Sequence, residues 1–139
     1  SIIYNEPIEN IWAVIKDRRY YLASKKEIQS FHIYDSVLPS WVEHYTKNDS
    51  VENVTKTIIE KKKFTYFTIN RKYQQINGFS YRLDSISDKK ASLTCYEFSR
   101  YFNIWASIYF QLFYPNTVID YEFVKINNSL EYLHSKNKP

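Results

Sequence analysis

The spacing of apolar residues changes twice along the chain and divides it into helical and extended parts. Near the N-terminus the apolar positions recur every three or four residues, which predicts a helix that ends near Asp17. These positions are Ile8, Ile11, Trp12 and Ile15. Residues 5–7, Asn-Glu-Pro, predict the helix start, because Asn can cap, Glu suits the helix dipole and Pro fits the first turn. Residues 1–4 read as a strand, and residues 18–25 as a second short helical turn.

From about residue 27 the apolar period falls to two, the period of a strand with one buried face. Strands rich in Thr, Ile, Val, Phe and Tyr are predicted at residues 28–35, 40–46, 51–60, 64–71, 79–87 and 91–100. Short polar segments join them, and Gly78 is expected to serve the turn that opens the fifth of these strands. Helices before and after an antiparallel meander indicate an α+β fold.

The C-terminal third has a different pattern. No charged residue occurs from Tyr101 to Ile119, but interspersed Asn, Ser and Gln and a break at Pro115 argue against a membrane-spanning helix. We expect the apolar groups of residues 101–114 to pack under a long closing helix; the alternative is a gate that meets a membrane. The closing helix follows Pro115 and carries an apolar stripe formed by Ile119, Phe123, Ile126, Leu130 and Leu133.

Composition narrows the function classes. The 139 residues suffice for a single domain, residues 1–139, and a lone glycine excludes the glycine-rich loops that bind dinucleotides and nucleotide phosphates. The net charge of +4 and the pI near 9.0 permit contact with anionic partners. A basic corner of Lys61–Lys63 with Lys56 and Arg71 favours peripheral contact with an anionic membrane, and nucleic acid is not expected.

The chain has no methionine and one cysteine, Cys95, and these counts bear on compartment. A single cysteine cannot form an internal disulfide, which favours the cytoplasm. A chain that begins at Ser1 lacks its encoded start, so a membrane anchor would follow if the missing segment were hydrophobic. We expect a monomer or a weak homodimer.

The order strand, helix pair, meander and long closing helix resembles the helix-grip fold of the START/Bet v 1-like (SRPBCC) superfamily. The similarity is carried by residues 3–17, by Trp41-Val42-Glu43 and by residues 121–133, and it is nearest to the bacterial polyketide cyclase/dehydrase and lipid transport branch. The resemblance implies a seven-stranded antiparallel sheet curled around the C-terminal helix, with two short helices after the first strand. It also implies a cavity between sheet and helix for an apolar or amphipathic ligand.

Candidate ligand-binding residues come from the strands and the closing helix. Tyrosines on separate predicted strands could share the inner face and offer hydroxyl groups to a ligand. Glu43 alternates with Trp41 and Tyr45, so it points inward or, in the alternative, lies on the solvated face beside a lysine. The candidate set is Trp41, Glu43, Tyr45, Tyr66, Tyr81, Tyr96, Ile119, Phe123 and Ile126.

No residue pattern predicts a catalytic set, a cofactor or a metal. The three histidines have no partner ligands at metal-binding spacing, and Cys95 has no base near it in sequence. We therefore expect a binding or transport protein for a hydrophobic or amphipathic small molecule such as a lipid, a quinone or a polyketide. The alternative is a cyclase or dehydratase that uses Glu43 or a tyrosine as acid or base. Two titratable groups converging in one pocket would favour that alternative.

Overall fold

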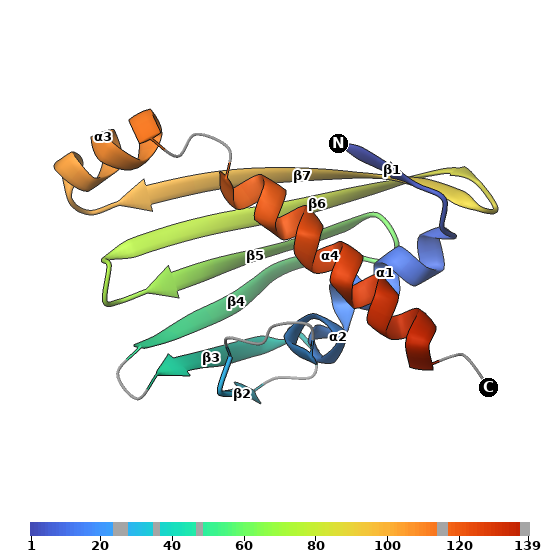
Figure 1. Ribbon diagram of the computed structural model, residues 1–139, viewed down its shortest axis with the longest axis horizontal. Helices are drawn as coiled ribbons and strands as arrows, with labels where there is room; N and C mark the ends of the chain where they lie inside the picture. The colour runs from blue at the N-terminus through green and yellow to red at the C-terminus, as the bar shows by residue number, and fades with distance from the viewer. Residues whose placement is uncertain (24–27, 35–36, 47–48, 114–116, 137–139) are drawn as a thin grey trace.

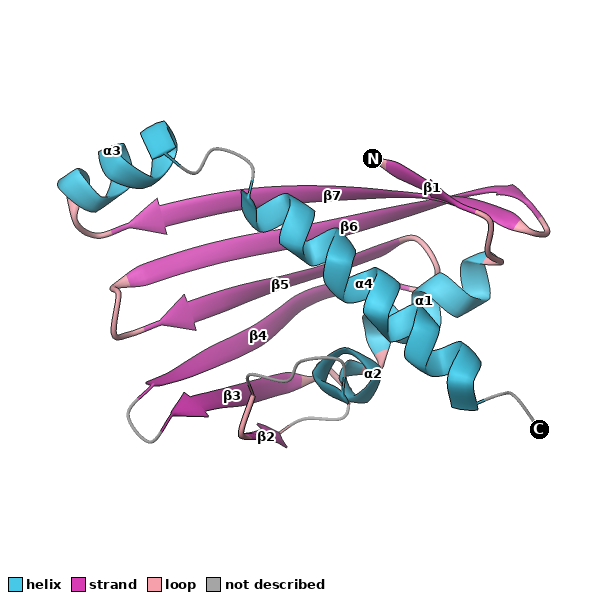
Figure 2. Ribbon diagram, viewed as in Figure 1, coloured by secondary structure: helices cyan, strands magenta, loops and turns pink. Residues whose placement is uncertain are grey.

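The computed structural model describes residues 1–23, 28–34, 37–46, 49–113 and 117–136, and shows one antiparallel sheet crossed by a long helix (Figures 1 and 2). The strands are β1 (Ile2–Tyr4), β2 (Ser30–Ile33), β3 (Ser40–Thr46), β4 (Asp49–Ile59), β5 (Lys63–Asn70), β6 (Gln75–Ser87) and β7 (Lys90–Tyr101). The helices are α1 (Ile8–Lys16), α2 (Arg18–Ala23), α3 (Ile104–Phe113) and α4 (Thr117–Lys136). The strand order is β1-β7-β6-β5-β4-β3-β2, so the predicted α+β helix-grip fold is confirmed.

The sheet curls toward α4, which crosses its concave face (Figure 1). Three bulges interrupt the ladders, between His44 and Thr46, between Thr55 and Thr57, and between Ser85 and Ser87. A bulge adds a residue to one strand and bends it, so these irregularities help the sheet to wrap around the helix. The predicted turns at residues 24–25, 35 and 47–48 and the break at Pro115 lie outside the described residues.

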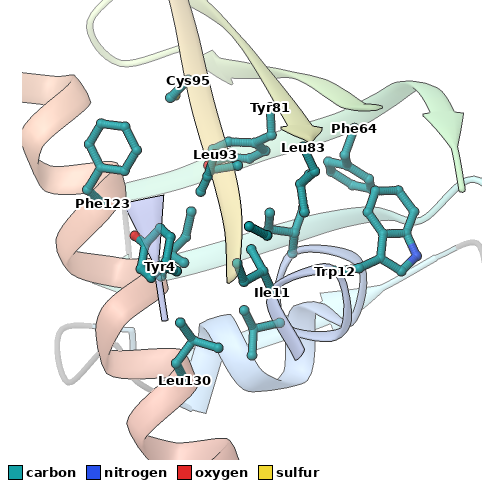
Figure 3. Close-up of a cluster of buried hydrophobic side chains, with 14 of the residues drawn as sticks. Tyr4, Ile11, Trp12, Phe64, Tyr81, Leu83, Leu93, Cys95, Phe123 and Leu130 are labelled. Carbon is teal, nitrogen blue, oxygen red and sulfur yellow. The ribbon is translucent and has the colours of Figure 1, made fainter. Parts of the chain in front are cut away.

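The hydrophobic core occupies one half of the space between sheet and helices (Figure 3). Phe64, Tyr81 and Leu93 from the sheet meet Ile11 of α1 and Leu130 of α4, all 6% exposed or less. The predicted stripe of α4 is buried here, with Ile119 partly buried at its N-terminal end. This packing fixes α4 against the sheet at its C-terminal half and leaves its N-terminal half to form a different environment.

Two local expectations about caps and turns are wrong. Helix α1 is capped at Pro7 with no side-chain cap hydrogen bond, and Asn10 donates instead to Glu6 at 2.9 Å. Gly78 lies within β6 and is buried, not in a turn, and its φ is not positive. A side chain at Gly78 would lie 2.5 Å from the Phe98 ring and 2.9 Å from the Phe67 ring. The glycine is therefore required by close packing of two aromatic rings across it.

Helix α3 corrects the expectation that residues 101–114 pack under the closing helix. It stands beyond the end of β7, apart from α4 (Figure 1). Trp105 is 75% exposed and Leu112 is 69% exposed. Within the described residues no helix is long and apolar enough to cross a membrane.

The basic corner expected from the sequence does not form as a single patch. Lys61–Lys63 lies at the β4–β5 hairpin, whereas Arg71 follows the other end of β5. An eight-residue strand separates them, about 25 Å in length. Arg71 binds Glu52 there, and Lys61 binds Glu9 at the opposite end.

Candidate ligand-binding site

A cavity of about 300 Å³ lies between the sheet and the N-terminal half of α4. Strands β3 to β6 form its floor and walls, and one turn of α4 forms its roof. The lining residues are Glu43, Tyr45, Asp49, Val51, Asn53, Tyr66, Thr68, Asn70, Gln75, Asn77, Phe79, Tyr121, Glu122 and Lys125. Most of these side chains carry hydrogen-bonding groups, so the cavity is more polar than the apolar pocket expected from the sequence.

Polarity rises steadily along the paired strands β5 and β6, from the core to the end of the sheet. Phe64 opposes Tyr81 in the core, and the next inward pair joins two cavity residues, Tyr66 and Phe79. The last two inward pairs are Thr68 with Asn77 and Asn70 with Gln75. The inner end of the cavity is therefore aromatic, and its outer end carries hydroxyl and amide groups.

Glu43 points inward, as one of the two sequence interpretations predicted. Its side chain belongs to a residue that is 2% exposed, and three groups donate to its carboxylate. Trp41 Nε1 and Asn53 Nδ2 donate to Oε1 at 2.9 and 3.4 Å, and the Tyr45 hydroxyl donates to Oε2 at 2.5 Å. These bonds replace water around the buried carboxylate and hold it in one orientation at the cavity wall.

Glu122 brings a second buried carboxylate into the same cavity from α4. It is 1% exposed and forms an ion pair with Lys125, and the Tyr66 and Tyr81 hydroxyls donate to its Oε2. Burial by itself would raise the pKa of Glu122, but Lys125, the hydrogen bond from Tyr81 and the charge of Arg18 together hold that pKa below its ordinary value. Glu122 is therefore ionised at neutral pH.

The two tyrosines that bind Glu122 remain protonated. Burial first, and then the charge of Glu122, raise the pKa values of Tyr66 and Tyr81 well above the ordinary tyrosine range. Both hydroxyls therefore act as hydrogen-bond donors at every physiological pH. They neutralise the Glu122 carboxylate together with Lys125.

Arg18 supplies a buried positive charge beneath this region. It is the first residue of α2 and is 2% exposed. Its guanidinium carbon lies 4.5, 4.6 and 4.4 Å from the ring centroids of Trp41, Phe64 and Tyr66. Cation–π contacts of this kind are strongest where water is excluded. Arg18 thus joins the helical N-terminal segment to the aromatic wall of the sheet.

The structure brings together part of the candidate set. Glu43, Tyr45 and Tyr66 line the cavity, while Trp41 and Tyr81 lie just behind it and bind its two carboxylates. The three apolar helix candidates, Ile119, Phe123 and Ile126, pack in or against the core and do not line the cavity. Their neighbours Tyr121, Glu122 and Lys125 face it instead.

Tyr96 does not share the inner face with the other tyrosines, contrary to expectation. Cys95 opposes Tyr81 in the β6–β7 ladder, so Tyr96 points to the convex side, where it is 56% exposed. The difference is a shift of a single residue, which moves a strand side chain to the other face. Burial raises the pKa of the inward Cys95 thiol to about 12, with a further contribution from Glu122, so this thiol is not a nucleophile at neutral pH.

Sequence reasoning missed Glu122, Lys125, Asn53 and Arg18. A signal existed for the first two: Glu122 and Lys125 each precede a residue of the apolar stripe by one position, so they border the buried face of α4. Asn53 is recognisable only after Trp41 is placed opposite it in the β3–β4 ladder. Arg18 has no sequence signal, because one buried and one exposed arginine stand side by side there.

Solved structures share this architecture. A hypothetical protein from Helicobacter pylori matches with a TM-score of 0.70 at 10% identity, over 94% of this chain and 83% of that one. A conserved protein from Geobacillus kaustophilus matches with a TM-score of 0.69 at 10% identity, over 97% of this chain and 92% of that one. The Zhui aromatase/cyclase from Streptomyces sp. R1128 matches with a TM-score of 0.70 at 9% identity, over 99% and 92%.

These likenesses establish the fold family alone, because identities near 10% carry no information about individual site residues. No family model matches the sequence. No curated protein matches it either. The function therefore has to be argued from the cavity itself.

Proposed function

We propose that the protein binds a small amphipathic molecule with several hydrogen-bonding groups in the cavity between its sheet and α4. The observation that carries this proposal is the polarity gradient between Phe79 at the inner end and Gln75 at the outer end. A ligand with a ring against Phe79 and Tyr66 and with hydroxyl or carbonyl groups toward Asn70, Gln75 and Asn77 would match it. Asn and Gln side chains offer both donors and acceptors for such groups.

The size of the cavity narrows the class of ligand. Ligand pockets usually span roughly 300–1,000 Å³, and about 300 Å³ lies at the small end. Among the ligands expected from the sequence, a quinone or a small polyketide-like ring fits better than a lipid with long acyl chains. The many polar lining groups support the same choice, since an acyl chain would leave them unpaired.

Ligand titration followed by amide NMR tests the proposal. Dihydroxynaphthalene should shift amides of cavity residues such as Asn53 and Asn77, and oleate should shift them far less. The Asn77→Leu variant should weaken dihydroxynaphthalene binding about tenfold by removing a hydrogen-bonding group at the cavity. Asn128→Leu, on the exposed face of α4, is the matched control and should bind normally. Tighter binding of oleate, or equal effects of the two variants, would contradict the proposal.

A second candidate function is acid–base catalysis of the cyclase or dehydratase type. It is favoured by one observation, the convergence of Glu43 and Glu122 on the same cavity. The pKa directions count against three of the groups: Glu122 stays ionised, and Tyr66 and Tyr81 stay protonated, so each moves away from neutrality. Glu43 is then the residue that would exchange a proton with a ligand.

Substitution of Glu43 distinguishes the two functions. The Glu43→Gln variant keeps the shape of the side chain and removes its basicity. If the protein only binds, a bound dihydroxylated or carbonyl-bearing aromatic compound is recovered unchanged from both proteins. If it is an enzyme, the wild-type protein converts the compound and Glu43→Gln does not, while binding measured by NMR persists in both.

A further inference from the structure

We propose that helix α3 is a membrane-docking element that inserts its exposed apolar face into a lipid bilayer surface. This inference does not rest on the proposed function. It starts from six large apolar side chains on a ten-residue helix, each at least 43% exposed. They are Ile104, Trp105, Ile108, Tyr109, Leu112 and Phe113.

The exposed side chains cover an unusually wide arc of the helix. At about 100° per residue, Ile104 and Phe113 lie about 180° apart, and the other four fall between them. Phe102, just before the helix, is a further 62% exposed. An apolar area of this kind on a soluble protein marks an interaction site.

The width and chemistry of this arc favour a fluid apolar phase over a protein partner. A helix packed against a second copy of the chain would cover a stripe of about 100° and leave both flanks in water. A bilayer surface surrounds a convex helix and covers the whole arc. No charged residue occurs from Tyr101 to Ile119, and Trp105 and Tyr109 are the side chains that prefer the membrane–water boundary.

Apolar burial, rather than charge attraction, carries the proposed contact. The cations nearest to α3 lie in the β5–β6 turn, where Arg71 binds Glu52 and Lys72 binds Asp49. The Lys61–Lys63 hairpin, at the other end of β5, is too far away to assist. Binding through α3 should therefore occur on zwitterionic lipid and gain little from anionic lipid.

The position of α3 also allows a bilayer to approach it. The helix projects past the end of β7 (Figure 1), and Phe102 bonds to the β5–β6 turn through Gln74 at 3.1 Å. At the same end, Gln75 of the cavity donates to the Tyr101 hydroxyl at 2.9 Å. The outer end of the cavity and the proposed docking helix thus lie side by side.

Trp105 provides a direct probe of the proposal. The other two tryptophans, Trp12 and Trp41, are 4% and 1% exposed, so a change in fluorescence on lipid binding reports on Trp105. Phosphatidylcholine vesicles should shift its emission to shorter wavelength, and lipids brominated on their acyl chains should quench it. No shift and no quenching would overturn the proposal without any substitution.

Two matched variants locate the contact. Leu112→Asp places a charge in the apolar arc and should lower vesicle partition about tenfold or more. Ile86→Asp changes a side chain that is 53% exposed on β6, away from α3, and should leave partition unchanged. Near-ultraviolet circular dichroism checks that both variants are folded. Equal losses in the two variants would overturn the proposal.

Two other occupants of the surface are outcomes of the same experiment. A blue shift that appears without lipid as protein concentration rises, together with a doubled mass in sedimentation, would identify a second copy of the chain and overturn the proposal. Binding only to vesicles with phosphatidylserine, undiminished by Leu112→Asp, would do the same and would indicate the Lys61–Lys63 hairpin.

Discussion

At the scale of single residues, the ion pair between Lys125 and Glu122 decides the character of the cavity. Replacing Lys125 by Met would leave the Glu122 carboxylate buried with tyrosine hydroxyls as its printed neighbours and no lysine beside it. We expect the free energy of unfolding in urea to fall by about 3–5 kcal/mol. The double variant Lys125→Met/Glu122→Gln should recover much of this loss, because no charge then remains. Equal stability of the single and double variants would contradict the argument.

The same carboxylate predicts how stability changes with acidity. The pKa of Glu122 in the folded state lies below its ordinary value, so its contribution is present above the ordinary pKa and is lost as pH falls through the folded one. Urea unfolding from pH 7 to pH 3 should show a steeper acid loss in the wild-type protein than in Glu122→Gln. Parallel stability curves for the two proteins would mean that Glu122 does not titrate with folding.

Gly78 gives a prediction on the other face of the sheet. Alanine there would lie 2.5 Å from the Phe98 ring, so Gly78→Ala should lower the free energy of unfolding by about 1–3 kcal/mol. The backbone itself tolerates alanine because φ is not positive. In a Phe98→Ala background the cost of Gly78→Ala should fall to less than half. An undiminished cost would locate the conflict elsewhere.

At the scale of elements, α4 is held by its apolar stripe. Leu130 is 6% exposed in the core, and Leu130→Ala should lower the free energy of unfolding by about 2–5 kcal/mol. Val124→Ala is the control, since Val124 lies on the same helix and is 50% exposed, and it should change stability by less than about 0.5 kcal/mol. Similar effects of the two substitutions would contradict the observed orientation of α4.

Periodicity predicted the elements well because each strand and helix has one buried face. The segment 40–46 matches β3 residue for residue, and the stripe of α4 is buried as expected. The apolar run of 101–114 could not be placed in this way, because its composition is the same whether it is packed inside or exposed. Only the three-dimensional position of α3, beyond the end of β7, separates the two cases (Figure 1).

The site was harder to predict than the fold, for a physical reason. Glu43 could be proposed because strand alternation offers only two directions, and one of them leads inward. Glu122 read as a dipole-stabilising residue, because charged positions near a helix start are usually solvated. Its burial depends on Lys125 and on tyrosines from two strands, which are 56 and 41 residues distant in sequence. Such a network is specified by tertiary contacts rather than by any local pattern.

At the scale of the whole molecule, stability and function occupy different ends of one sheet. The core under α1 and the C-terminal half of α4 is closely packed, and the opposite end holds the cavity and α3. This division allows the cavity to carry buried charge, because the cost of burying that charge is offset by the packing of the core. It also places the least supported helix next to the outer end of the cavity.

Hydrogen exchange followed by mass spectrometry measures this division directly. Helix α3 is short and projects its apolar face into solvent, so its amides should exchange at least about a hundredfold faster than those of β5 in the middle of the sheet. Adding phosphatidylcholine vesicles should slow exchange in α3 and leave β5 unchanged, since docking shields the helix alone. If α3 were as protected as α4 without lipid, and lost that protection on dilution, its apolar face would be covered by a second copy instead.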